Sequence, residues 1–298
     1  MTVEEKNAAT HPWVLAIRPK TLPASMSPVI VGTATAFADH GFKLFPALAA
    51  LAGSLLLQIG VNLANDYFDY KKGVDTPERL GPTRVTQSGL ISPGRVKSAM
   101  IITFGLAMLV GVYLISVGGW PIMVVGTAAI LAALAYSGGP FPLGSHGLGD
   151  LFVFIFFGPV AVCGTYYVQR PQLTLPVLLT SIPIGFLITA ILVVNNLRDI
   201  ETDQGAGKRT LSVLLGKKGA RIEYVLLLAG AYFAPLILWM AGWVSAFTLL
   251  PFLSLPMALF LIRRTLQEQG QVMNRSLSGT AQLSILFSIL FSLGLILA

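Results

Sequence analysis

Long apolar runs without charged residues recur along the whole of this 298-residue chain. Only 11% of its residues are charged, whereas soluble domains carry about 25%. A helix of about 17 residues or more is long enough to cross the apolar interior of a bilayer. Nine runs meet this length: 22–38, 44–64, 98–117, 119–137, 150–168, 174–195, 222–241, 243–262 and 277–297. We therefore predict an all-α, polytopic membrane protein with nine transmembrane helices, which form a single domain over residues 1–298.

The basic residues predict the orientation of these helices. With a cytoplasmic N-terminus, eighteen of the twenty Lys and Arg residues fall in cytoplasmic segments, and only Lys43 and Arg170 fall outside. This bias is typical of membrane proteins, whose cytoplasmic loops are enriched in positive charge. It also explains the net charge of +7 without a nucleic-acid partner. We expect the first run to remain a span, although Ala34-Thr35-Ala36 resembles the cleavage site of a signal peptide.

Seven of the thirteen acidic residues fall in two short stretches at the ends of apolar runs. The Asn and Asp residues of interest are Asn62, Asn65, Asp66, Asp69 and Asp75 in the first stretch, and Asn196, Asp199 and Asp203 in the second. Carboxylates beside a bilayer are costly unless they bind a cation, pair with a base or face water. Spacings of three and four residues place each carboxylate pair on one face of a helix. Such faces suit Mg2+, which binds one or two carboxylates together with phosphate oxygens and water.

A basic loop that contains glycines follows each acidic cluster. Arg84 lies in the first loop, Arg198 lies within the second cluster, and Lys208 and Arg209 lie in the loop after it. Basic groups beside carboxylates and glycines favour contact with a diphosphate, although basic loops also determine topology. The Asn and Asp residues would also serve as helix caps, but their recurrence four spans later favours metal binding and a pseudo-repeat of the two helices that carry them. We interpret the chain as a membrane enzyme that handles a diphosphate; a cation-coupled transporter is the alternative from another class.

A set of motifs covers nearly the whole chain. It consists of Arg18-Pro19-Lys20-Thr21, Asn62-x-x-Asn65-Asp66-x-x-Asp69, Lys72-Gly73-x-Asp75, Gly81-Pro82-x-Arg84, Gly147-Leu148-Gly149-Asp150, Asn195-Asn196-x-Arg198-Asp199-x-x-x-Asp203 and Gly207-Lys208-x-Thr210. With these motifs the chain resembles the UbiA superfamily of intramembrane aromatic prenyltransferases, and within it the 1,4-dihydroxy-2-naphthoate polyprenyltransferases of menaquinone biosynthesis. Many relatives that use 4-hydroxybenzoate carry a third aspartate where this chain has Gly73. The acid lies instead at Asp75, an arrangement associated with the naphthoate branch.

The resemblance implies a reaction and a metal cofactor. A polyprenyl group would pass from polyprenyl diphosphate to 1,4-dihydroxy-2-naphthoate with loss of CO2, giving demethylmenaquinol. Mg2+ ions would be held by the catalytic residues Asp66 and Asp69 on one side and Asp199 and Asp203 on the other. The nearest alternative is the same chemistry on another aromatic acceptor, such as 4-hydroxybenzoate, homogentisate or a porphyrin.

The resemblance also gives expectations for the surrounding residues. Those expected to orient the carboxylates or to add metal ligands are Asn62, Asn65, Asp75 and Asn196. Those expected to contact the diphosphate are Arg84, Lys208, Arg198 and Arg209. Lys20 and Tyr136 are expected to contact the aromatic acceptor. We expect the site to face the cytoplasm from the cell (inner) membrane, with the prenyl tail reaching membrane lipid.

Overall fold

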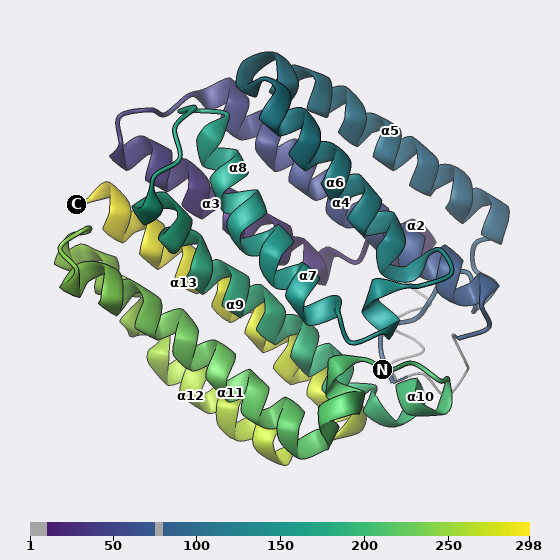
Figure 1. Ribbon diagram of the computed structural model, residues 1–298. Helices are drawn as coiled ribbons and strands as arrows, with labels where there is room; N and C mark the ends of the chain where they lie inside the picture. The colour runs from purple at the N-terminus through teal and green to yellow at the C-terminus, as the bar shows by residue number, and fades with distance from the viewer. Residues whose placement is uncertain (1–10, 75–79) are drawn as a thin grey trace.

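The computed structural model describes residues 11–74 and 80–298 of the chain. Within these ranges every regular element is a helix (Figure 1). The α-helices are α2 (Pro12–Ile17), α3 (Leu22–Ala38), α4 (Leu44–Lys71), α5 (Pro93–Gly118), α6 (Trp120–Ser137), α7 (Gly149–Ile155), α8 (Ala161–Tyr167), α9 (Leu175–Arg198), α10 (Ile200–Gly205), α11 (Leu211–Met240), α12 (Leu255–Gln267) and α13 (Met273–Ile296). The 3-10 helical segments are η1 (Pro19–Thr21), η2 (Leu143–Ser145), η4 (Ala246–Ser254) and η5 (Gly270–Val272), and the π-helical segment is η3 (Phe156–Val160). The prediction of an all-α fold is therefore confirmed.

Eight helical stretches in the described residues are long and apolar enough to cross a membrane, so the chain is a multi-pass membrane protein. The first predicted run forms α3, which has 17 residues and is not among these eight. The fifth predicted run is divided into α7, the π-helical η3 and α8. Pro159 lies inside η3, and a proline lacks the N–H that an α-helix requires there. The count of nine spans and the cytoplasmic N-terminus stay predictions.

Of the three hydrophobic clusters among the described residues, the two larger ones contain most of the buried apolar side chains. The larger cluster contains Leu187 of α9, Leu228 of α11 and Phe287 of α13, all of which are buried. The smaller cluster contains Leu63 of α4 and Phe104 of α5. In Figure 1, α4, α5 and α6 run along one side of the molecule, and α9, α11, α12 and α13 run along the other. The two helices that end in acidic clusters, α4 and α9, therefore belong to different hydrophobic clusters.

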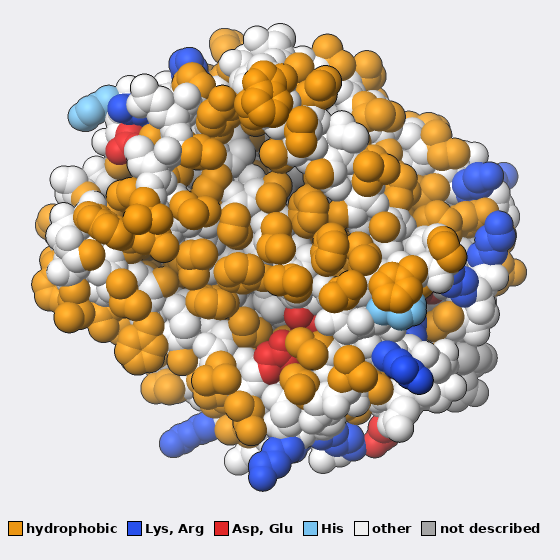
Figure 2. Space-filling view, in the orientation of Figure 1, with side chains coloured by type: hydrophobic (Ala, Val, Ile, Leu, Met, Phe, Trp, Pro, Cys, Tyr) orange, Lys and Arg blue, Asp and Glu red, His pale blue; other side chains and the backbone are white. Residues whose placement is uncertain are grey.

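The outer surface of the helices is apolar. Leu109 of α5 and Trp120 of α6 are 68% and 72% exposed. Figure 2 shows hydrophobic side chains over most of one face, with most of the visible Lys and Arg side chains along the rim near α10. Apolar surface of this extent is unfavourable in water, whereas acyl chains solvate it well. The surface is therefore consistent with helices that face lipid.

Small residues allow close helix contacts beside the site. A Cβ atom at Gly158 in η3 would lie 2.9 Å from the Cα atom of Gly185 in α9. A Cβ atom at Gly32 in α3 would lie 2.5 Å from the carbonyl oxygen of Val162 in α8. Helices in lipid pack through such small residues because their backbones can then approach closely. These contacts hold η3 and α8 against α9 and α3.

Candidate active site

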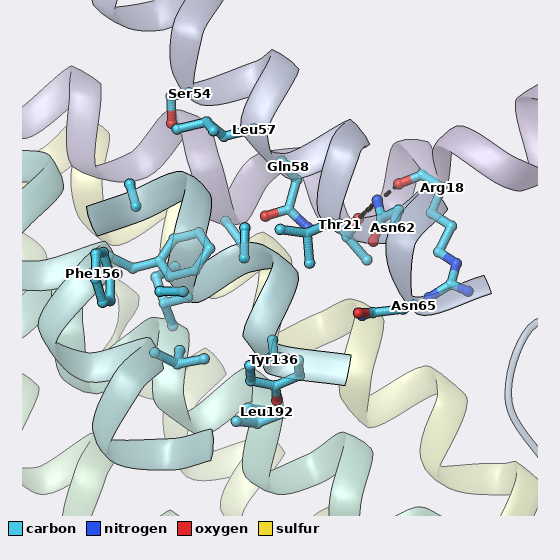
Figure 3. A pocket seen from close by; sticks show the side chains of 18 of the residues that line it. Arg18, Thr21, Ser54, Leu57, Gln58, Asn62, Asn65, Tyr136, Phe156 and Leu192 are labelled. Carbon is cyan, nitrogen blue, oxygen red and sulfur yellow. Dashed lines mark hydrogen bonds between the residues drawn. The ribbon is translucent and has the colours of Figure 1, made fainter. Parts of the chain in front are cut away.

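A cavity of about 1380 Å3 that is open to the outside is lined by residues of helices α2 to α10 and α13. Its polar end is formed by the last turns of α4 and α9, residues 80–84 and Lys208. Much of the remaining wall is apolar and includes Met108, Phe156 and Ile188. Figure 3 shows Gln58, Asn62 and Asn65 following one another along α4. A charged group at one end and apolar walls beyond it suit a substrate with a polar head and an apolar tail.

Asp69 is the residue of the first cluster whose carboxylate lines this cavity. It lies in the last turn of α4, which ends at Lys71 and is followed by Gly73 with a positive φ of 66°. The Arg84 guanidinium donates to Asp69 at 3.0 Å. The ammonium of Lys208 lies 3.9 Å from the same carboxylate oxygen. The first cluster and the two predicted diphosphate contacts Arg84 and Lys208 thus meet at one carboxylate.

Asp66 has different surroundings from Asp69, although the two share a helix face. Its carboxylate is 1% exposed and is not part of the cavity wall. The backbone N–H groups of Val85 and Thr86 donate to its two oxygens at 3.1 and 3.0 Å. Arg18 lies 3.9 Å away. Residues three apart on a helix diverge by about 60°, because each residue turns the helix by about 100°. Asp66 therefore meets the loop, whereas Asp69 meets the cavity.

Asp199 brings the second cluster to the same cavity. It is the residue at which α9 ends and α10 begins, and it is 5% exposed. The Arg198 guanidinium donates to both of its oxygens, at 2.8 and 2.5 Å. Arg198 also donates to the side-chain oxygens of Asn195 and Asn274, both at 2.9 Å. Arg198 is 2% exposed and is not part of the cavity wall, so it supports Asp199 from behind.

Lys208 links the two clusters. Its ammonium lies 3.6 Å from Asp203 and 3.9 Å from Asp69. Gly207 has a positive φ of 74°, which lets the chain turn after α10 so that the Lys208 N–H donates to the Asp203 carbonyl at 2.9 Å. The side chain of Arg209 is exposed and is not part of the cavity wall, while its backbone N–H donates to Ser145. The structure therefore brings Lys208 to the cavity and leaves Arg209 outside it.

The predicted asparagines all line the cavity. Asn62 donates to the carbonyl of Ile17 at 2.9 Å. It also donates to the hydroxyl of Thr21 at 3.0 Å, and Figure 3 shows these two side chains next to each other. The side-chain oxygen of Asn65 accepts a hydrogen bond from Ser137 at 2.7 Å. Asn62 therefore fixes the segment before α3, and Asn65 joins α4 to α6. Asn196 contributes to the wall beside Asp199, and the predicted ligand Asp75 lies outside the described residues.

Both predicted acceptor contacts lie on the cavity wall. Lys20 is exposed and belongs to η1. Tyr136 lies in the last turn of α6. A Cβ atom at Gly144 would lie 2.8 Å from the Tyr136 ring, so there is no room for a larger residue at this position. A Cβ atom at Gly149 would lie 3.2 Å from the Tyr136 hydroxyl. Gly144 and Gly149 therefore leave space for the ring and the hydroxyl of Tyr136.

Several residues of the polar wall were not predicted as site residues. Examples with polar side chains are Arg18, Thr21, Gln58, Asn274 and Arg275. Arg18 and Thr21 fall within the first sequence motif, which is a signal that points to them. Gln58 lies one helical turn before Asn62, so the same helix face carries both. Asn274 and Arg275 stand alone at the start of a distant apolar helix, where the sequence gives no signal.

Acidic and basic side chains lie close together at the polar end of the cavity. Lys72 donates to the Ser137 carbonyl at 2.7 Å. Partial desolvation lowers the pKa of Lys72 from its ordinary value, with the negative charge of Asp69 opposing this shift and Lys208 adding to it. No group of three His, Cys, Asp or Glu side chains among the described residues forms a compact metal site. The oxygens of Asp69, Asn196, Asp199 and Asp203 are nevertheless suitable donors for Mg2+, which also binds through substrate phosphates and water.

The comparisons with known sequences identify the class of protein. Residues 25–293 match the UbiA prenyltransferase family, and the chain belongs to this family. It is 38% identical to the 1,4-dihydroxy-2-naphthoate octaprenyltransferase of Escherichia coli, over 99% of this chain and 98% of that protein. It is 42% identical to the protein of the same name from Mycobacterium tuberculosis, over 77% of this chain and 78% of that protein. The resemblance stated from the motifs is confirmed, and the chain is a prenyltransferase.

Solved structures show the same fold. A UbiA homologue from Aeropyrum pernix superimposes with a TM-score of 0.71 over 94% of this chain and 98% of its own, at 17% identity. A UbiA homologue from Archaeoglobus fulgidus, bound to DMAPP and Mg2+, gives a TM-score of 0.69 over 96% of this chain and 99% of its own, at 15% identity. The helical fold is therefore that of UbiA proteins.

Proposed function

We propose that this protein transfers a polyprenyl group from polyprenyl diphosphate to 1,4-dihydroxy-2-naphthoate in a Mg2+-dependent reaction that releases CO2. The observation that carries the proposal is the meeting of Asp69, Asp199 and Asp203 with Arg84 and Lys208 at the polar end of one largely apolar cavity. Carboxylates that hold metal ions and bases that hold phosphate are needed together when a diphosphate is the leaving group. The names of the similar bacterial proteins support the naphthoate as acceptor.

Asp69, Asp199 and Asp203 are the residues that would hold Mg2+, with Asn65 and Asn196 as neutral oxygen donors beside them. Bound Mg2+ supplies positive charge that stabilises the departing diphosphate. The A. fulgidus homologue solved with DMAPP and Mg2+ supports this choice of metal.

Asp66 and Arg198 act on the site through other residues. Asp66 accepts hydrogen bonds from the backbone that follows Arg84 and so holds that segment in place. Arg198 fixes the carboxylate of Asp199 through two hydrogen bonds. Groups that orient metal ligands in this way change metal affinity or activity by 10- to 100-fold when they are removed.

Arg84 and Lys208 would contact the phosphate oxygens, with the planar guanidinium of Arg84 suited to two parallel hydrogen bonds. The C–O bond to the diphosphate breaks, and the allylic carbon takes on positive charge. Water at that carbon would give the free prenol, so the reaction needs dry walls. Met108, Phe156 and Ile188 are among the apolar residues that line the cavity beyond its polar end.

The acceptor would bind beside Lys20 and Tyr136, which line the same cavity. Lys20 at the mouth would pair with the naphthoate carboxylate, and Tyr136 would contact the ring. The ring carbon that bears the carboxylate attacks the allylic carbon. This attack forms the new C–C bond, and the neighbouring hydroxyl loses its proton as it becomes a ketone. The carboxylate then leaves as CO2, which makes the ring aromatic again, and the ketone oxygen takes up a proton to restore the hydroxyl.

We place this site at the cytoplasmic side of the cell membrane. The carboxylates lie at the ends of α4 and α9, beside Lys and Arg residues that the positive-inside rule assigns to the cytoplasm. Both substrate heads are charged and would arrive from that side. The prenyl tail would extend along the apolar walls toward lipid.

The test uses purified protein in detergent with Mg2+, a long-chain polyprenyl diphosphate and 1,4-dihydroxy-2-naphthoate labelled in its carboxyl group. We expect prenylated product, detected by mass, together with an equal amount of released CO2, and we expect EDTA to stop both. Product with 4-hydroxybenzoate or another aromatic acceptor, and none with the naphthoate, would keep the prenyl transfer and overturn the proposed acceptor. Absence of product with every acceptor, from folded protein, would contradict the proposal.

A further inference from the structure

We infer that Asn274 is a positioning residue that sets the spacing between the two halves of the diphosphate site. The inference rests on the proposed function and adds to it a residue of the last helix. Asn274 lies in the first turn of α13, far in sequence from both acidic clusters, and it lines the polar end of the cavity.

Both ends of the Asn274 amide are hydrogen-bonded. Its oxygen accepts from the Arg198 guanidinium at 2.9 Å, and its nitrogen donates to the Leu80 carbonyl at 3.1 Å. A guanidinium can only donate, and a carbonyl oxygen can only accept. One orientation of the amide therefore satisfies both partners, and a flipped amide would lose both hydrogen bonds.

Each hydrogen bond of Asn274 leads to a carboxylate of the site. On one side, Arg198 donates two hydrogen bonds to the Asp199 carboxylate. On the other side, Leu80 lies four residues before Arg84, which donates to Asp69. Asn274 therefore connects the hydrogen bonds that lead to Asp199 with those that lead to Asp69.

Among the described residues, Asn274 is one of the contacts that fix the distance between these two sets of hydrogen bonds. Leu63 of α4 and Leu197 of α9 pack into different hydrophobic clusters, so the two helices do not share a core at this point. Lys208 also links the clusters, but its ammonium is 3.6 to 3.9 Å from the carboxylates and sits on a flexible four-carbon chain. Asn274 offers the shorter contacts on a stiffer side chain. A diphosphate held from both sides needs this spacing, since a shift of about 1 Å costs roughly 100-fold in rate.

The first variant to test is Asn274→Leu, which keeps the size of the side chain and removes both hydrogen bonds. Its control is Ser278→Ala, because Ser278 lies one helical turn later on α13 and lines the same cavity. Binding of Mn2+ in the presence of inorganic pyrophosphate is measured on the purified full-length protein by electron paramagnetic resonance of the free ion. We expect the apparent Kd for Mn2+ to rise about tenfold or more in Asn274→Leu and to stay unchanged in Ser278→Ala.

A second measurement separates positioning from a general loss of structure. The KM for the aromatic acceptor should stay unchanged in Asn274→Leu, because Lys20 and Tyr136 lie on other elements. Asn274→Gln keeps the amide and displaces it by one methylene, so it should also weaken Mn2+ binding, and it carries the test if the leucine variant does not fold. Unchanged Mn2+ binding in either folded variant would overturn the inference, as would equal weakening in Ser278→Ala. If neither variant folds, Asn274 serves the fold and the inference is also overturned.

The two proposals fail in distinguishable ways. Wild-type protein that forms no prenylated product would count against the proposed function. Wild-type protein that forms product while Asn274→Leu binds Mn2+ normally would count against the role of Asn274 alone.

Discussion

Asp66 and Asp69 show how a single helical turn separates two tasks. The carboxylate of Asp69 faces the cavity, whereas that of Asp66 accepts two backbone N–H groups of the following loop. Three-residue spacing predicts a common helix face but does not identify the partner of each side chain. The metal role expected for Asp66 stays a prediction, and its hydrogen bonds add a role in holding the loop that carries Arg84.

Asp66→Ala should weaken binding of the prenyl diphosphate. The substitution leaves the N–H groups of Val85 and Thr86 buried without their acceptor, so the segment around Arg84 loses its anchor. We expect the KM for the prenyl diphosphate to rise about tenfold or more, by analogy with other residues that orient ligands. Steady-state kinetics with varied diphosphate measures this. An unchanged KM in folded protein would show that the loop does not depend on Asp66.

Lys208 and Arg209 provide a matched pair of adjacent cations. Lys208→Ala removes an ammonium that lies near both Asp69 and Asp203, so we expect kcat/KM for the prenyl diphosphate to fall about tenfold or more. Arg209→Ala removes an exposed side chain outside the cavity wall, so its kcat/KM should stay within about twofold of wild type. The two variants are compared in one kinetic assay. Equal losses would contradict the placement of these two side chains.

At the scale of elements, most helices could be predicted from apolar runs alone. The run 44–64 forms the first three-quarters of α4, and the helix continues through the polar cluster to Lys71. The run 150–168 contains a π-helical turn that hydropathy does not reveal, because it depends on Pro159 and on close packing at Gly158. The contacts of Asn274 join segments far apart in sequence, and local patterns carry no information about them.

Gly158→Ala tests the close contact between η3 and α9. The added Cβ atom would lie 2.9 Å from the Gly185 Cα atom and 3.2 Å from the Ser181 carbonyl oxygen, and a backbone cannot move aside as a flexible side chain can. We expect a loss of roughly 1–3 kcal/mol in stability, seen as a lower Tm in detergent. Gly105→Ala in α5 is the control, since no atom lies within 4 Å of its added Cβ. An unchanged Tm for Gly158→Ala would contradict the close packing.

At the scale of the whole molecule, the orientation in the membrane remains a prediction from charge. Figure 2 shows most of the visible Lys and Arg side chains along the right and lower edges of the molecule, and this uneven distribution agrees with the prediction. Cys163 is the one cysteine of the chain, so a Cys163→Ala background gives a protein without thiols. Lys218→Cys in α11 and Gln172→Cys before α9 then place single thiols at the two predicted sides.

Labelling of these thiols with a membrane-impermeant maleimide tests the orientation. In intact spheroplasts we expect Gln172→Cys to react and Lys218→Cys to be protected until the membrane is opened, because eighteen of the twenty basic residues are predicted to be cytoplasmic. The reverse pattern would place the carboxylates on the opposite side of the membrane. Reaction of both thiols in sealed spheroplasts would contradict the span count.

The most direct test of the central claim compares wild-type protein with Asp199→Ala in the assay of naphthoate prenylation at saturating Mg2+. Asp199 lines the cavity, and its carboxylate accepts two hydrogen bonds from Arg198. Removal of this carboxylate would remove part of the charge that holds Mg2+ and so stabilises the leaving diphosphate. We predict that wild-type protein forms product and that turnover of folded Asp199→Ala is lower by at least roughly 100-fold. Near-normal turnover in Asp199→Ala would contradict a site in which both acidic clusters act on one diphosphate.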